Sequence, residues 1–271
     1  MLPYVKSYAF IAYVLGIVVP IGFITVLSWI TGYYLPTTIP GVIASVALLA
    51  VCLLSAKRIA TRMADSYAER VLSLYNDSCD PQAFVEQGRA IAERIRPPYE
   101  ENGSWFLSFY ALALDDIGQR DEAVRIGQTM LSSARRAEDP GQKVSLLVNM
   151  EPLISRLFGA QQTLDLIQEA LTAAQESGQA EPAQVSFLQW ERSMLEAVRD
   201  GDHETLAQRF SSVRTSSTAP MRMRVSDALL EASVRKARGE RDLERECLDF
   251  VVRNGNKLPA VKLAQERIAA L

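Results

Sequence analysis

The sequence predicts an all-α protein in which a two-helix transmembrane hairpin is followed by an α-solenoid. Three observations support this prediction. Fifty consecutive residues, from Ser7 to Ala56, contain no Asp, Glu, Lys, Arg or His. After that block, apolar residues recur at the three- and four-residue spacing of helices and do not alternate as they do in strands. Short turns divide this second part at nearly constant intervals.

The charge-free block is long enough for two membrane spans, because one helix needs about 20 apolar residues to cross the hydrocarbon core. We expect spans at about 8–30 and 39–56, which define a transmembrane domain over 1–56. Between them, Gly32, Pro36 and Pro40 break helices. A cleaved signal peptide is the alternative, but its apolar region would extend over only about 7–15 residues.

Basic residues flank the block and predict its orientation. Lys57, Arg58 and Arg62 follow the second span, and Lys6 precedes the first. Positive residues stay on the cytoplasmic side of a membrane, so we expect both termini and the domain 57–271 to be cytoplasmic. The lipid bilayer would then be one partner, with the three residues after the second span beside anionic headgroups.

Small residues recur along the second span, at Gly41, Ala44, Ala47 and Ala50. Small side chains let membrane helices approach closely, so this stripe predicts packing on the first span or on the spans of a larger complex. The block has no ionisable group of the kind that transport pathways use. We therefore expect an anchor and not a transporter.

Composition limits what residues 57–271 can do. The chain carries 29 basic and 32 acidic residues, a net charge of −3, which argues against nucleic-acid binding. Its three cysteines, Cys52, Cys79 and Cys247, form no CxxC pair and suit a reducing compartment.

Turns near Ser78, Gly118, Gly159, Gly201 and Gly239 are separated by 38 to 42 residues. Helical hairpins at a constant period predict an α-solenoid, because one hairpin cannot bury its apolar face alone. Five hairpins are expected, at 57–96, 103–136, 141–177, 182–214 and 220–253, and a capping helix at 257–270 closes the array.

Prolines predict where several helices begin. Pro81, Pro140, Pro182 and Pro220 each suit a first helical position, whereas Pro152 should kink a helix or begin a new one. No Gly or Pro occurs from Ala44 to Asn76, so we expect the second span to continue into the first solenoid helix.

The stretch from Tyr110 to Ala123 resembles the inner half of a tetratricopeptide repeat. Ala111 and Leu114 precede the turn at Gly118, and Ala123 follows five residues later. Other matching positions are Trp190 and Phe210 around Gly201, and Ala232 and Leu248 around Gly239. The spacing is longer than the family's usual 34 or so residues, and an unrelated helical-hairpin solenoid is the alternative.

The resemblance implies a concave groove, lined by the first helix of each hairpin, that binds a protein or peptide. The residues that it would place there are Trp105, Ser108, Asp115, Glu191, Arg199 and Lys236. The regular Lys/Asn pattern with which some family members hold a terminal carboxylate is missing, which puts binding of that kind in doubt. Trp190 and Trp105 are expected mainly in the solenoid core, with an exposed anchor as the alternative for Trp105.

Motifs for chemistry are scarce. The single histidine, His203, lies in Gly201-Asp202-His203-Glu204 without the second histidine of a zinc-protease motif, and no phosphate-binding glycine loop occurs. We expect no catalytic residues, cofactor, metal or small-molecule substrate. The leading hypothesis is a membrane-anchored scaffold for protein–protein interaction. The alternatives are an accessory subunit of a membrane transport or envelope-assembly complex and an enzyme with an unfamiliar site.

Overall fold

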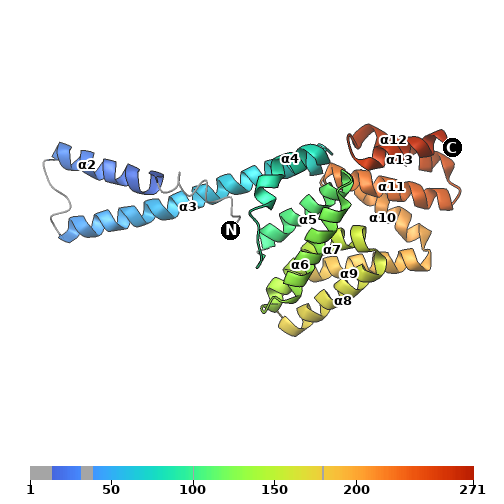
Figure 1. Ribbon diagram of the computed structural model, residues 1–271, viewed down its shortest axis with the longest axis horizontal. Helices are drawn as coiled ribbons and strands as arrows, with labels where there is room; N and C mark the ends of the chain where they lie inside the picture. Colours follow the sequence, from blue (N-terminus) through green and yellow to red (C-terminus); the bar gives the residue numbers. More distant parts are fainter. Residues whose placement is uncertain (1–13, 32–38, 100, 179) are drawn as a thin grey trace. The chain divides into compact units, whose positions relative to one another are not determined.

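The computed structural model describes residues 14–31, 39–99, 101–178 and 180–271, and every regular element in these ranges is helical (Figure 1). The chain forms two compact units, Met1–Glu69 and Arg70–Leu271. The elements are η1 (Val14–Val18, a π-helical turn), α2 (Val19–Thr31), α3 (Ile39–Asn76), α4 (Pro81–Ala92), α5 (Glu101–Asp116), α6 (Arg120–Arg135), α7 (Pro140–Phe158), α8 (Ala160–Ser177), α9 (Pro182–Asp200), α10 (His203–Thr215), α11 (Met221–Ala237), α12 (Arg241–Asn254) and α13 (Pro259–Ala269).

The predicted transmembrane hairpin is wrong. Among the described residues, no helix combines the length and the apolar character that crossing a bilayer requires. The first predicted span corresponds to η1 and α2, with residues 8–13 outside the described ranges. With 13 residues, α2 is about 20 Å long, whereas the hydrocarbon core is about 30 Å thick. The same finding contradicts the predicted location as an integral membrane protein with cytoplasmic termini.

The second predicted span, 39–56, is not a separate element. It is the beginning of α3, a 38-residue helix that continues through charged positions to Asn76, so the expected continuity of the helix is confirmed. Ala47, Ala50, Arg58 and Arg62 are exposed, and the exposure of Gly41, Ala44 and Lys57 lies outside the described set. The roles predicted for these residues presupposed a bilayer.

The unit Arg70–Leu271 is a series of helical hairpins, as a helical-repeat solenoid requires. The five predicted hairpins correspond to the end of α3 with α4, and to α5–α6, α7–α8, α9–α10 and α11–α12, and α13 closes the series. From α4 to α13 each helix packs on the next one in the chain, and α5 also contacts α7 while α7 contacts α9. Helix α11 packs mainly on α10 and α12. The contacts of α5 with α7 and of α7 with α9 join first helices of successive hairpins, as stacking predicts.

Glycine turns and prolines at the first helical position account for most of the points where helices begin and end. Gly118, Gly159, Gly201 and Gly239 end the first helix of their hairpins with positive φ, a conformation that side chains disfavour. Helices α4, α7 and α9 begin at their predicted prolines, and α11 begins one residue after Pro220. Pro152 neither ends nor restarts α7, which is continuous around it.

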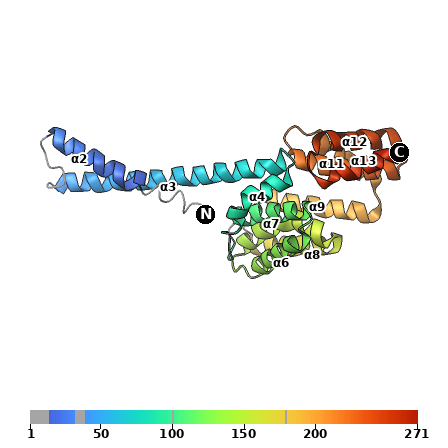
Figure 2. The ribbon, with the colours of Figure 1, turned by 45° about the horizontal axis from the view of Figure 1, so that its top comes forward.

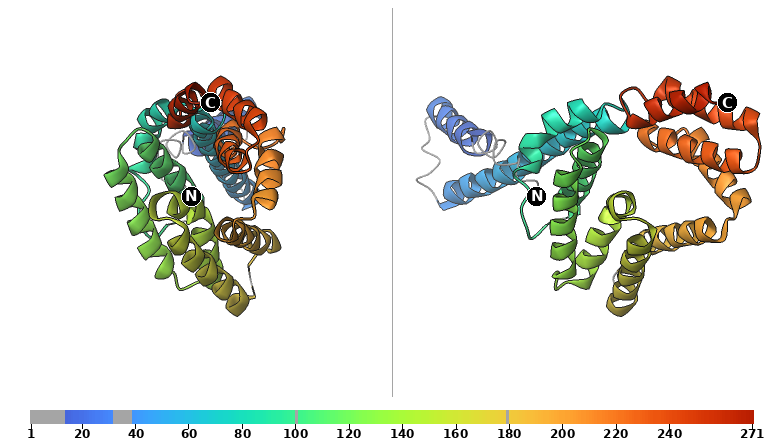
Figure 3. Two further views of the ribbon diagram at one scale, coloured as in Figure 1. Left: turned by 90° about the vertical axis from the view of Figure 1, so that its right-hand side faces the viewer. Right: turned by 45° about the vertical axis from the view of Figure 1, so that its right-hand side comes forward.

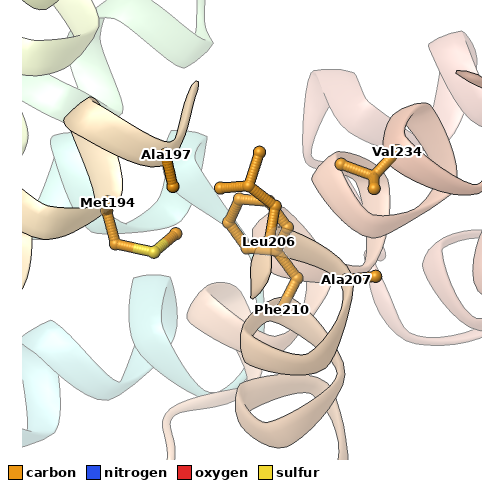
Figure 4. Packing of buried hydrophobic residues seen from close by; sticks show 6 residues of the cluster. All are labelled: Met194, Ala197, Leu206, Ala207, Phe210 and Val234. Carbon is orange, nitrogen blue, oxygen red and sulfur yellow. The ribbon is translucent and has the colours of Figure 1, made fainter. Parts of the chain in front are cut away.

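The core lies between neighbouring helices and is partly aromatic. The ring of Phe84 stacks on Tyr75 with centroids 5.5 Å apart and meets the ring of Phe106 edge-on at 5.5 Å. A second cluster joins α9, α10 and α11, where Leu206 and Phe210 lie between residues of the two flanking helices (Figure 4). Its members are Met194, Ala197, Leu206, Ala207, Phe210 and Val234.

The end of this unit contacts its beginning. Asn256 Nδ2 donates to the carbonyl of Ser78 at 2.8 Å, and the backbone amide of Lys257 donates to the carbonyl of Cys79 at 3.2 Å. Arg222, on α11, donates from Nε to Asn76 Oδ1 at 3.2 Å. The hairpins of residues 70–271 therefore follow a closed path, in which α12 and α13 come back beside the start of α4 (Figure 2 and Figure 3).

Candidate functional site

The six residues predicted to line a groove do not form one site. Trp105 is 39% exposed and its ring packs edge-on against Phe109, while Ser108 is buried and its Oγ has no hydrogen-bond partner among the described residues. Arg199 and Lys236 are exposed at the ends of α9 and α11, and Arg199 pairs with the adjacent Asp200. Asp115 and Glu191 join two separate clusters of charged side chains.

Asp115 belongs to a structural network. Its carboxylate accepts from Arg120 Nη1 at 2.8 Å and from Arg156 Nε at 3.0 Å, and Arg156 also donates to Asp116 at 2.5 Å. Asp116 in turn accepts from the hydroxyl of buried Tyr75 at 2.6 Å. These bonds join the end of α3 to α5 and α7, so the charge of Asp115 is neutralised within the fold.

A second group of side chains gathers from four helices, and we call it the charged site. Its members are Glu151 of α7, Trp190 and Glu191 of α9, Arg209 of α10 and Asp227 of α11. Glu151 and Glu191 repel one another, and Arg209 attracts both Glu191 and Asp227. The guanidinium carbon of Arg209 lies 3.0 Å from the ring centre of Trp190, which is 41% exposed.

The carboxylates of the charged site are poorly solvated. Burial raises the pKa of Glu151, and repulsion from Glu191 acts in the same direction. Burial also raises the pKa of Glu191 against the attraction of Arg209, and it raises the pKa of Asp227 to about 6. The cost of ionising these groups in place is therefore high, because burial disfavours the charged form.

Glu151 differs from the other buried glutamates. Glu231 accepts from Arg214 at 2.8 Å and from Arg235 at 3.1 Å, and Glu244 pairs with Arg267 at 2.7 Å. Glu151 is only 4% exposed, yet it forms no hydrogen bond or ion pair with any residue in the described ranges. A buried carboxylate without a cation is unusual in a folded protein.

Sequence reasoning found only part of this site. Glu191 was predicted, whereas Glu151, Arg209 and Asp227 were not, and Trp190 was expected in the core. One signal was present for Glu151, which is a single acid within the apolar run from Leu146 to Ile154. Nothing local distinguishes Arg209 and Asp227 from other surface charges.

A pocket of about 450 Å³ opens between α4, α5 and α6. Its floor is made of buried side chains and its rim of exposed charges of both signs. The floor residues are Ala92, Ile95, Tyr99, Leu107 and Tyr110, and the rim residues are Arg89, Glu93, Arg96, Glu122 and Arg125. The mixed rim favours neither an anionic nor a cationic ligand.

The two buried thiols of this unit are weak nucleophiles. Burial raises the pKa of the Cys79 thiol to about 11 and that of Cys247 to about 12, so both are protonated at neutral pH and are weak nucleophiles. His203 is exposed at the first residue of α10. The part of the chain that the structure describes contains no group of three His, Cys, Asp or Glu side chains placed to hold a metal ion.

The chain matches no protein-family model, no curated protein and no solved structure.

Proposed function

We propose that this chain is a tetratricopeptide-like protein-binding module whose charged site contacts a segment of a protein partner. Three of the five residues of that site come from α7 and α9, the first helices of successive hairpins, and a fourth comes from α11. In helical-repeat proteins, stacked repeats build an extended surface of this kind, and partners bind to it.

The observation that carries the proposal is the contact between Trp190 and Arg209. Binding free energy in interfaces is concentrated on Trp, Tyr and Arg side chains, above all where polar groups become desolvated. Here a half-exposed tryptophan carries an arginine on its face, and the Nε and Nη2 atoms of that arginine lack hydrogen-bond partners among the described residues. A partner that covers this pair would bury the exposed aromatic surface of Trp190.

The proposed function involves no catalysis, and two properties of the chain support a binding role. The two buried thiols are held protonated, and Asp115 and Asp116 are engaged by arginines. These four groups are thus not free to act as nucleophile or acid.

Photo-crosslinking from single positions tests the proposal. The full chain is expressed in its own cells with the photoreactive residue p-benzoylphenylalanine at position 190 and, in a matched control, at position 263. Leu263 lies on α13 and is 47% exposed, close to the 41% of Trp190. We expect a discrete protein adduct from position 190 and none from position 263. Equal adducts from both positions, or none from position 190, would contradict the proposal.

A further inference from the structure

We infer that the chain forms a homodimer in which the α3 helices of two copies pair in antiparallel orientation through an exposed apolar stripe. The stripe lies in the first half of α3, within the unit Met1–Glu69, and shares no residue with the charged site. Its residues occur at the three- and four-residue spacing that places side chains on one face of a helix. They are Ile43, Val46, Ala47, Ala50, Val51 and Leu54, and all six are exposed.

An apolar face of this width is normally buried, because in a globular protein it packs on the core. Here the four larger side chains of the stripe are between 59% and 64% exposed. Six further side chains, on α2 in the same unit, are at least 55% exposed: Val18, Val19, Ile21, Phe23, Val26 and Trp29. Monomeric proteins rarely expose apolar patches larger than a few hundred Å², so surface of this extent indicates an interface.

The exposed apolar area is sufficient for a stable dimer. At roughly 100 Å² each, the four larger side chains of the stripe and the six on α2 expose about 1,000 Å² on each copy. A stable interface buries about 800 Å² on each partner, and homodimer interfaces are more apolar than most. The stripe alone supplies less than this area, so the interface extends onto α2.

The symmetry of the stripe identifies the partner as a second copy of the chain. Read in either direction, it gives two large residues, two alanines and two large residues. The intervals between these six residues are also the same in both directions, and the midpoint falls between positions 48 and 49. A face with this symmetry matches a reversed copy of itself, and two-fold interfaces are self-complementary in this way. Neither a different protein nor a lipid surface requires such symmetry.

Antiparallel pairing about this midpoint determines which residues meet. Ile43 of one copy lies at the same height along the paired helices as Leu54 of the other, and Ala47 lies at the height of Ala50. The alanines come at the crossing point, where small side chains let the two helix axes approach to about 8 Å. The valines of the stripe flank them at the edges of the interface.

The charges of α3 favour the antiparallel orientation over the parallel one. The stripe lies in the block from Ser7 to Ala56 that has no ionisable residue, so pairing buries no charge. Parallel pairing would bring Arg58 of the two copies to the same height, where like charges repel. Antiparallel pairing separates the two arginines by about 28 Å along the helices.

Cysteine cross-linking of two co-expressed full chains with different tags tests the inference. One chain carries I43C, the other carries L54C, and both carry C52A because Cys52 is itself on α3. A disulfide requires two Cα atoms within about 7 Å of one another. We expect a disulfide-linked dimer from the mixed chains and none from either variant alone, because antiparallel pairing holds two copies of one of these positions about 16 Å apart.

Sedimentation of the full chain measures the strength of the dimer. A50E places a charge beside the two-fold axis, so we expect it to raise the dimer dissociation constant at least about tenfold. S66E adds the same charge to α3 at an exposed position outside the stripe and should sediment as the wild type does. Circular dichroism checks folding, and the cross-linking experiment decides alone if A50E does not fold.

Four results would overturn the inference. They are sedimentation of the wild type as a 30.0 kDa monomer, equal dissociation constants for A50E and S66E, cross-links from I43C alone as efficient as from the mixture, and flotation with phosphatidylcholine vesicles without any cross-link from the mixture. The last result would assign the stripe to lipid. These variants leave the charged site unchanged, so the adduct from position 190 tests the proposed function separately.

Discussion

Lys257 and Asp80, which are 177 residues apart in sequence, form an ion pair with 2.5 Å between Lys257 Nζ and Asp80 Oδ2. Asp80 is also the N-cap of α4, where its Oδ1 accepts from the amide of Ala83 at 3.1 Å. The same carboxylate thus caps α4 and forms an ion pair with the loop that precedes α13. These two contacts join the last helices of the unit Arg70–Leu271 to its first hairpin.

The two roles of Asp80 can be separated by substitution. K257A removes only an ion pair whose lysine is 60% exposed, so we expect it to lower the free energy of unfolding by less than about 1 kcal/mol. D80A also removes the helix cap, and it should cost about 1–2 kcal/mol. D80N retains a capping oxygen and should resemble K257A. Urea unfolding monitored by circular dichroism measures all three, and equal losses in D80A and D80N would show that the cap contributes nothing.

The hydroxyl of Tyr75 connects the end of α3 to the network of Asp116 and Arg156. Tyr75 is fully buried, and its hydroxyl donates to Asp116 at 2.6 Å. Y75F keeps the ring that stacks on Phe84 and leaves one oxygen of Asp116 without its donor. We expect a loss of about 1–3 kcal/mol in the free energy of unfolding. A loss below about 0.5 kcal/mol in urea unfolding would mean that this bond does not stabilise the first hairpin.

Gly88 allows α4 to pack closely on α5. A Cβ atom at this position would lie 3.2 Å from Cζ of Phe106 and 3.5 Å from Cδ2 of Tyr110. G88V should therefore destabilise the fold by about 1–3 kcal/mol through overpacking. A90V, on the exposed face of the same helix, should cost only about 0.5 kcal/mol from helix propensity. Thermal or urea unfolding that gives equal losses for the two variants would contradict the close packing.

Glu151 makes stability depend on pH. Burial raises its pKa from an ordinary value to about 8 in the folded chain. Between about pH 4.5 and pH 8 the folded state therefore binds more protons than the unfolded state, and stability falls as the pH rises through this window. E151Q removes the titrating group and should raise the free energy of unfolding at pH 8 by at least about 1 kcal/mol, with little change at pH 5.

The control for this prediction is E176Q, which changes an exposed glutamate of α8. Urea unfolding midpoints at pH 5, 6.5 and 8 give the comparison. Parallel pH profiles for wild type, E151Q and E176Q would show that Glu151 is ionised at no cost to the fold.

The sequence predicted the repeat architecture well because its signals are local. A glycine with positive φ commonly ends a helix, whatever the rest of the fold. Gly118 and Gly201 end helices in this way at their predicted turns. Pro152 shows the limit of such rules, since α7 continues through it. The prediction of a transmembrane hairpin was wrong because a charge-free block does not determine where its helices begin and end. Helix α2, with 13 residues, is too short to span a bilayer.

The charged site was only partly predictable because long-range packing assembles it. Glu191 could be placed on a first helix by periodicity, but its neighbours Glu151 and Asp227 come from hairpins about 40 residues away on either side. Trp190 was assigned to the core on residue type, whereas the structure leaves it half-exposed beneath Arg209. Side-chain burial and pairing, and not the sequence pattern, distinguish Glu151 from other glutamates.

Photo-crosslinking from position 190 tests most directly whether the charged site contacts a protein partner. The account predicts a discrete protein adduct from position 190 in cells and none from position 263, whose residue, Leu263, has a similar exposed fraction. Equal adducts from the two positions, or no adduct from position 190, would contradict the account.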